Sequence, residues 1–226
     1  MFIGHFALGL AAKKVAPGVS LGTYFLAVQW ADLLWPTLLL TGYETVEIVP
    51  GITRVTPLDF TSYPISHSLL MMVLWGGLLG LIYWLSKRNS KAALVIALAV
   101  VSHWILDFVT HRPDMPLWPG DSPLLGLGLW NSVWGTVLVE VSLFIGCVWM
   151  YNNQTRPNNG QGKWAFWSLV IFLLIIYIMN LTGPPPPNVV AIAWAGHLQW
   201  LMVLWGYWID RNRSIRPVVM EKAKLD

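Results

Sequence analysis

Six apolar stretches, each about as long as a bilayer is thick, constrain this chain more than any other feature of its sequence. They lie at about residues 20–42, 67–86, 91–111, 131–151, 164–182 and 189–210. A membrane-spanning helix needs roughly 17–25 apolar residues. A shorter apolar stretch at residues 2–12 predicts a re-entrant or tilted helix. The sequence therefore predicts an all-α, multi-pass transmembrane bundle of six spans plus this short helix, forming one integral membrane domain over residues 1–226.

The composition excludes several other classes of protein. Hydrophobic residues make up 56% of the chain and charged residues 11%, whereas the surface of a soluble domain needs about a quarter of its residues charged. The basic residues occur in short runs between apolar stretches, which argues against nucleic-acid binding. Because Cys147 is the single cysteine, a metal would have to be held by histidine and carboxylate side chains. A homo-oligomer remains compatible with the sequence.

The connections between the apolar stretches alternate in charge. Lysine and arginine gather around residues 13–14, 87–91, 156–163 and 211–226, so these connections and the C-terminal tail should face the cytoplasm. The other connections, at residues 43–66, 112–130 and 183–188, hold most of the acidic loop residues and should face outward. Residues 46–56 alternate β-branched and polar side chains between turn residues, which predicts a small outer hairpin or surface flap.

Ionisable side chains inside apolar spans are costly, by about 2.5–3.5 kcal/mol on insertion scales, and so demand a partner or a purpose. Here they include Asp32, His103, Asp107, Glu140 and His197. The strongest local pattern is His103, Asp107 and His111, whose spacing of four residues predicts one helix face with a drift of about 40° per step. On this geometry His103 and Asp107 can bind one cation, and His111 more readily serves a second ion or the substrate. A proton relay or a simple polar pair remains an alternative.

The predicted orientation brings the polar residues to one depth. The residues that should all lie from the middle to the outer half of the membrane are His5, Asp32, His67, the His103–Asp107–His111 face, Asn131, Glu140 and His197. Such clustering predicts an outward-facing pocket in which imidazole and carboxylate ligands hold one or two divalent ions, with zinc as the default. A polar core that only stabilises helix packing is the alternative.

Four segments within about residues 1–140 also resemble a known family. These are Gly4-His5, Ala31-Asp32-Leu33-Leu34-Trp35-Pro36, Ser66-His67-Ser68-Leu69-Leu70, and Ser102-His103-x-x-x-Asp107 followed by Pro116-Leu117-Trp118-Pro119. Their order and spacing resemble the bacterial inner-membrane metal-dependent hydrolases and, more distantly, the zinc-dependent phospholipase C and P1 nuclease superfamily. The resemblance implies that Asp32, His67, His103 and Asp107 are metal ligands, joined less directly by His111 and Glu140. The last two spans match no motif.

Together these observations predict an enzyme of the bacterial inner membrane. It would use the metal to hydrolyse an ester or phosphoester of a lipid or another amphiphile from the outer face. Glu140 is the predicted general base, Asn131 a predicted hydrogen-bond donor to the substrate, and His5 a further member of the metal site. A small proton- or cation-coupled transporter and a non-catalytic membrane scaffold are the alternatives.

Overall fold

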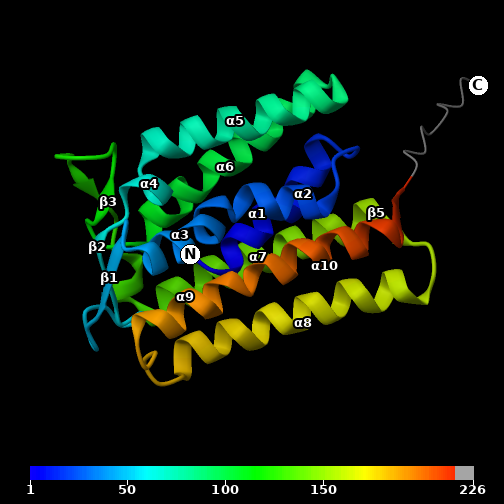
Figure 1. Cartoon of the computed structure of the whole chain (residues 1–226). Coiled ribbons are helices and arrows are strands. Elements are labelled where there is room, and N and C mark those ends of the chain that lie inside the picture. The colour runs from blue at the N-terminus through cyan, green and yellow to red at the C-terminus, as the bar shows by residue number, and fades with distance from the viewer. Residues whose placement is uncertain (217–226) are drawn as a thin grey trace, which may run out of the picture.

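The computed structural model describes residues 1–216 and is an all-α helical bundle with three small two-stranded sheets at its ends (Figure 1). The predicted cytoplasmic tail therefore lies largely outside the described residues. The helices are α1 (Ile3–Val15), α2 (Leu21–Val28), α3 (Trp30–Thr41), α4 (Pro64–His67), α5 (Leu69–Lys87), α6 (Ser90–Thr110), α7 (Val133–Gln154), α8 (Gly160–Thr182), α9 (Val189–His197) and α10 (Gln199–Arg211). A 3-10 turn, η1 (Leu129–Asn131), precedes α7.

Five helical segments within residues 1–216 are long and apolar enough to cross a membrane: α5, α6, α7, α8, and α9 together with α10. Their outward faces carry exposed leucine, isoleucine and tryptophan side chains, including Leu74, Leu98, Ile145 and Ile171. A soluble protein rarely exposes so much apolar surface, whereas lipid covers it without cost. The predicted multi-pass bundle is thus confirmed.

The stretch at residues 20–42 is not among these five segments, and like the segment of α9 and α10 it is not one continuous helix. It divides at Gln29 into α2 and α3, which have 8 and 12 residues. Pro36 lies inside α3 without ending it. The prediction of a single span here was wrong, and the division matters for the site because it leaves the last carbonyl groups of α2 without helical partners.

The short N-terminal helix predicted at residues 2–12 is confirmed as α1. It lies in the middle of the bundle (Figure 1), where His5, Phe6 and Leu10 are almost wholly buried. At its far end, the buried Lys13 ammonium pairs with Asp210 of α10 at 2.7 Å. α1 therefore connects the interior of the bundle to the end that holds the basic turns.

Local sequence signals explain where the long helices begin. The side chains of Ser68, Asn89, Ser132, Asn159 and Asn188 each accept a hydrogen bond from a backbone N–H in the first turn of the helix that follows. Such caps satisfy donors that a helix start leaves free. α5 and α6 then pack closely, because a Cβ at Gly76 would lie 2.7 Å from the carbonyl oxygen of Ala97.

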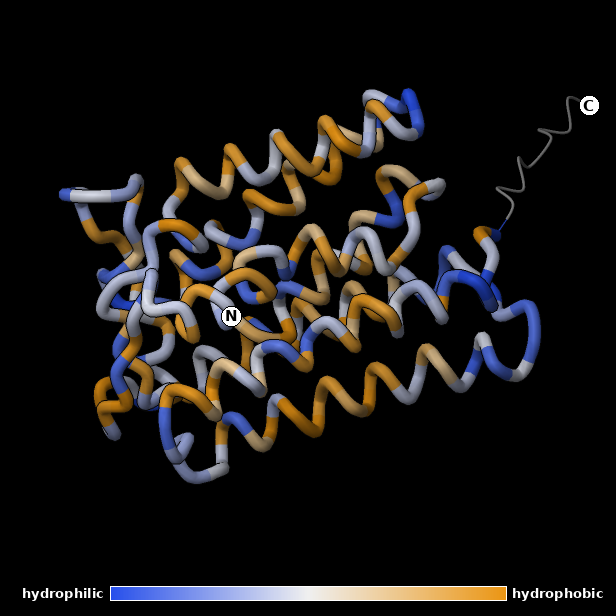
Figure 2. Tube along the Cα trace, in the orientation of Figure 1, coloured by the Kyte–Doolittle hydropathy of each residue, from blue (hydrophilic) through white to orange (hydrophobic). Residues whose placement is uncertain are grey.

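The two ends of the bundle differ. One end holds the turn between α5 and α6, the turn between α7 and α8, and the sheet of β5 (Thr155–Pro157) with β6 (Arg213–Ile215) (Figures 1 and 2). The other end carries the antiparallel hairpin of β1 (Thr45–Ile48) and β2 (Leu58–Ser62) and the small sheet of β3 (Met115–Pro116) and β4 (Leu124–Leu125). The hairpin predicted around residues 46–56 is therefore present, and the basic turns all lie at the opposite end.

Candidate functional site

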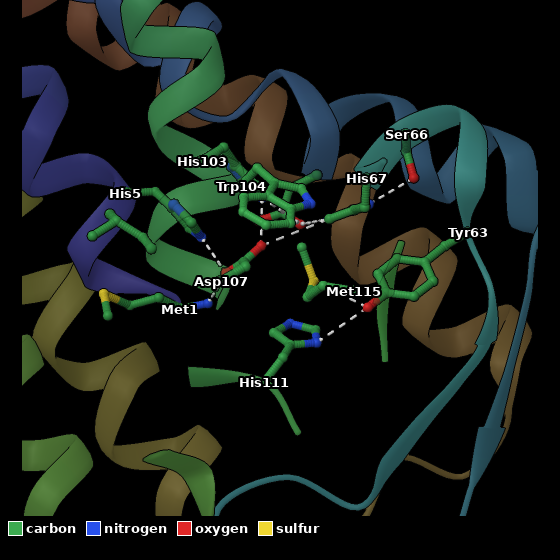
Figure 3. A network of polar contacts seen from close by, with 12 residues as sticks. Met1, His5, Tyr63, Ser66, His67, His103, Trp104, Asp107, His111 and Met115 are labelled. Carbon is green, nitrogen blue, oxygen red and sulfur yellow. Dashed lines mark hydrogen bonds and ion pairs between the residues drawn. The ribbon is translucent and has the colours of Figure 1, made fainter. Parts of the chain in front are cut away.

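Four elements bring five of the predicted metal ligands together below the β1–β2 hairpin. α1 provides His5, α3 provides Asp32, α4 provides His67, and α6 provides His103 and Asp107. The possible ligand atoms form two groups, His5–His103–Asp107 and Asp32–His67–His103, and within each group they all lie within 4.8 Å of one another. Figure 3 shows His5 from α1, His67 from α4, and His103 and Asp107 from α6 converging on one point. We call these five residues the His/Asp cluster.

The distances inside the His/Asp cluster are short, and its members are shielded from water. Nε2 of His103 lies 3.0 Å from Oδ2 of Asp107, and Nε2 of His5 lies 3.0 Å from Oδ1 of the same carboxylate. Nε2 of His67 lies 3.6 Å from Oδ1 of Asp32. The Asp32 side chain is 23% exposed, whereas the other four side chains are exposed by 4% or less. Asp32 is therefore the member that faces the open side.

The orientation of His103 follows from the division between α2 and α3. Its Nδ1 lies 2.7 Å from the carbonyl oxygen of Val28, the last residue of α2. A carbonyl can only accept, so Nδ1 donates, and in the neutral ring Nε2 is then the nitrogen that points its lone pair at the cluster. Nε2 is buried and has no hydrogen-bond partner in the described part of the chain. A buried imidazole nitrogen that faces a carboxylate and makes no hydrogen bond is the arrangement expected of a metal ligand.

A second buried chain of hydrogen bonds orients His67. The Ser66 hydroxyl lies 2.5 Å from Oε2 of Glu44 and 2.6 Å from Nδ1 of His67. It donates to the carboxylate and accepts from Nδ1–H, so in the neutral ring of His67 Nε2 is the nitrogen that points its lone pair at the cluster. Backbone N–H groups of Ile65 and Ser66 hold the other Glu44 oxygen at 2.7 and 2.8 Å. From the sequence alone, Glu44 is only one of the acidic residues in the outward connection at residues 43–66.

If the cluster holds the zinc ion predicted from the sequence, Ser66→Ala is expected to weaken its binding by about 10- to 100-fold, the usual effect of removing a hydrogen bond that orients a ligand. The imidazole of His67 would then lose the partner that fixes its tautomer. The measurement is competition with a chromogenic chelator on protein purified in detergent. Ser102→Ala is the matched control, because that hydroxyl bonds only the Ala99 carbonyl in α6. Equal affinities in the two variants would contradict the role given to Ser66.

His111 is placed differently from the expectation. α6 ends at Thr110, and His111 has an extended backbone with φ −66° and ψ 150°, so the expected helix face holds His103 and Asp107 only. Nδ1 of His111 lies 2.9 Å from Oδ1 of Asp114, and the Tyr63 hydroxyl donates to the same oxygen at 2.8 Å. Burial lowers the pKa of His111, and burial together with Asp114 raises the pKa of Tyr63 well above its usual value. Both groups are therefore neutral near pH 7.

Aromatic rings enclose this side of the site. The ring centres of Phe60 and Trp130 lie 4.8 and 4.2 Å from that of His111. Trp35 of α3 packs on Phe60 with the centres 5.5 Å apart. The rings restrict access of water to the imidazole, which strengthens electrostatic interactions there.

Glu140 lies beside the His/Asp cluster without joining either group of ligand atoms. It is 1% exposed, and its Oε2 accepts a hydrogen bond from the backbone N–H of Phe2 at 3.0 Å. The partner of this carboxylate therefore comes from outside its own helix, at the start of α1. The amino nitrogen of Met1 pairs with Asp107 next to it.

Two further polar residues lie away from the cluster. Asn131 ends η1, is exposed, and does not line the cavity described below. His197 in α9 bonds the Ala193 carbonyl at 2.8 Å and the Thr37 hydroxyl at 3.1 Å. Asn131 therefore does not lie next to the predicted ligands, which argues against its predicted contact with the substrate. His197 links α9 to α3 through its hydrogen bonds.

A cavity of about 700 Å³ opens onto the cluster and Glu140. Asp32, His67, Asp107 and His111 line its polar part. The rest of the cavity is lined by the loop between β1 and β2, the end of α8, α9, and the proline-rich connector at residues 183–187 between the two helices. The cavity thus joins a set of ionisable groups to apolar walls, as sites for small molecules commonly do.

The fold and this site together define a multi-helix membrane protein with a buried histidine and aspartate cluster near one end. The family model described as YdjM inner membrane protein matches residues 56–183. Since this match covers more than half of the chain, the protein belongs to the YdjM inner membrane protein family, and its place is the bacterial inner membrane. No curated protein and no solved structure matches the chain.

Proposed function

We propose that this protein is a membrane-embedded, metal-dependent hydrolase that cleaves an ester or phosphoester of an amphiphile. The observation that carries the proposal is Nε2 of His103, which makes no hydrogen bond within the described residues and faces the Asp107 carboxylate in a buried cluster. A structural polar pair would instead satisfy both groups by hydrogen bonds. A divalent ion held there would supply Lewis acidity for hydrolysis.

The residues present fit such an ion. Three imidazoles and two carboxylates form a mixed nitrogen and oxygen donor set, which suits zinc and related divalent ions. Cys147, buried in α7, is not part of either group. Both groups use His103, whose Nδ1 is already bonded to Val28. One nitrogen binds one ion, so the arrangement favours a single ion per chain.

The other residues would then act on the substrate. The Glu140 carboxylate, held by the Phe2 N–H, would take a proton from the attacking water as general base. His111 would remain neutral and fixed by Asp114, with its Nε2 free to contact the substrate. The aromatic rings around His111 would limit competing water.

The decisive experiment combines elemental analysis with hydrolysis assays. Protein purified in dodecylmaltoside without added metal should carry about one zinc or similar ion per chain. It should hydrolyse bis-(p-nitrophenyl) phosphate or p-nitrophenyl butyrate, and a chelator should abolish this activity. Protein that holds no metal would support a polar scaffold and overturn the proposal.

One observation favours the transporter alternative. The divisions in α2–α3 and α9–α10 lie side by side, where the Gln29 amide donates to Oε1 of Gln199 at 2.9 Å. Paired interrupted helices are common at the substrate sites of transporters. Metal binding without hydrolysis, together with cation-dependent flux in proteoliposomes, would favour that function over the hydrolase.

The proposed site faces the periplasm, because every basic turn lies at the opposite end of the bundle. In a Cys147→Ala background, a membrane-impermeant maleimide should label Tyr43→Cys in intact spheroplasts and leave Ser90→Cys unlabelled. Both positions are exposed in the structure. Thr53 in the hairpin loop would be a poor choice, since it is buried. Labelling of Ser90→Cys alone would place the site toward the cytoplasm.

A further inference from the structure

Tyr177 is a buried side chain whose hydroxyl has no hydrogen-bond partner within residues 1–216. Only 5% of its surface is exposed. Leaving a buried hydroxyl unpaired costs free energy, whereas phenylalanine would pack equally well without that cost. The hydroxyl therefore calls for a partner that the described chain does not contain.

The position of Tyr177 on α8 indicates where this partner would be. The buried stripe of α8 is otherwise apolar and runs through Ala165, Leu169 and Leu173 toward Tyr177. Tyr177 then lines the cavity that also contains Asp107, His111 and Glu140. The buried hydroxyl of Tyr151 in α7 also has no partner within the described residues, but Tyr151 does not line this cavity. Tyr177 combines the unpaired hydroxyl with a place in the cavity wall.

A basic side chain lines the same cavity from the hairpin. Arg54 lies in the loop between β1 and β2 and lines the cavity. Its backbone N–H donates a hydrogen bond to the Trp130 carbonyl at 3.1 Å, which holds the loop against Trp130. The Arg54 side chain is exposed. With a divalent ion in the cluster, the cavity would thus offer positive charge and a free hydroxyl to an anionic group.

The remaining wall is apolar and leads to the lipid-facing surface. Leu181 of α8 and Ile192 and Ala195 of α9 line the cavity. Ile178 and Trp194, on the same two helices, are more than half exposed. A hydrocarbon chain entering from the bilayer between these helices would therefore contact apolar side chains near the polar part of the cavity.

We propose that the cavity binds an amphiphile with a phosphate-type anionic head, and that the Tyr177 hydroxyl donates a hydrogen bond to an oxygen of this head. Arg54 attracts the same head from the hairpin side, and the hydrocarbon lies along α8 and α9. This inference deepens the proposed hydrolase by naming its substrate class. It also gives α8, which matches no motif, a direct role in binding.

The test uses hexylphosphonate, because its carbon–phosphorus bond resists hydrolysis and its short chain limits partitioning into detergent micelles. Binding to the zinc-loaded protein would be followed by tryptophan fluorescence, since Trp35 and Trp130 line the cavity. Tyr177→Phe should raise the dissociation constant about tenfold, the effect of one lost hydrogen bond to a charged group. Tyr151→Phe is the matched control and should leave binding unchanged.

The readout is independent of catalysis, so the two proposals can fail separately. Tyr177-dependent binding of hexylphosphonate without hydrolysis of any ester would sustain this inference and overturn the hydrolase. Equal binding by wild type and Tyr177→Phe, or no binding by either, would overturn the inference. Hexyltrimethylammonium should not compete with hexylphosphonate, and competition by this cation would contradict an anion site.

Discussion

His103→Ala should remove nearly all bound metal, because His103 belongs to both groups of ligand atoms. Structural zinc sites with four ligands are worth about 10–16 kcal/mol, or roughly 2.5–4 kcal/mol per ligand. Losing one ligand therefore costs about a hundred- to a thousandfold in affinity. Elemental analysis after gel filtration should show metal falling from about one ion per chain to a trace.

Variants at the other positions should rank below His103→Ala. His5→Ala and Asp32→Ala each leave the opposite group complete and should retain part of the metal. His111→Ala should also retain metal, since His111 belongs to neither group. His197→Ala is the matched control, because that imidazole only links α9 to α3. Complete metal loss from His111→Ala alone would show that the primary site includes His111.

Glu140→Gln should retain the metal and lower the rate of hydrolysis about 10²- to 10⁴-fold, the usual contribution of a general base. Glutamine keeps the size of the side chain and an oxygen to accept the Phe2 N–H, but it cannot take up a proton at neutral pH. The measurement pairs initial rates with metal content. Ser142→Ala, an exposed position on the same helix, should leave both unchanged.

Two other outcomes for Glu140→Gln would change the interpretation. Loss of metal would make Glu140 a ligand and transfer the role of base to another group. An unchanged rate would remove Glu140 from the chemistry and strengthen the transporter alternative.

The features of this fold that could be predicted from the sequence are those that depend on the length of apolar stretches, the spacing of residues and the charge of the connections. The long helices follow from apolar length, and the His103–Asp107 pair follows from a spacing of four residues. The placement of the basic and acidic connections at opposite ends of the bundle follows from the charges of the connecting segments. These signals place all six predicted metal ligands in one layer, and the structure brings five of them together, without His111.

The remaining features depend on contacts between distant segments. Nothing around Gln29 signals the end of α2, whereas Pro36, a stronger helix breaker by propensity, is accommodated inside α3. Glu44 reaches Ser66 only because the β1–β2 hairpin folds back on α4. His111 fell outside the expected helix face because α6 ends one residue earlier. Tyr177 had no local pattern, since its significance lies in a cavity formed by other helices.

Moving the His/Asp cluster into another helical bundle would require the interruption between α2 and α3 as well as the five side chains. Val28 can hold His103 only because its carbonyl is not used by a further turn of the same helix. Grafting the five His/Asp side chains onto a bundle of straight helices would leave that imidazole free to rotate and to change tautomer. A faithful transplant must carry the broken helix along with the ligands.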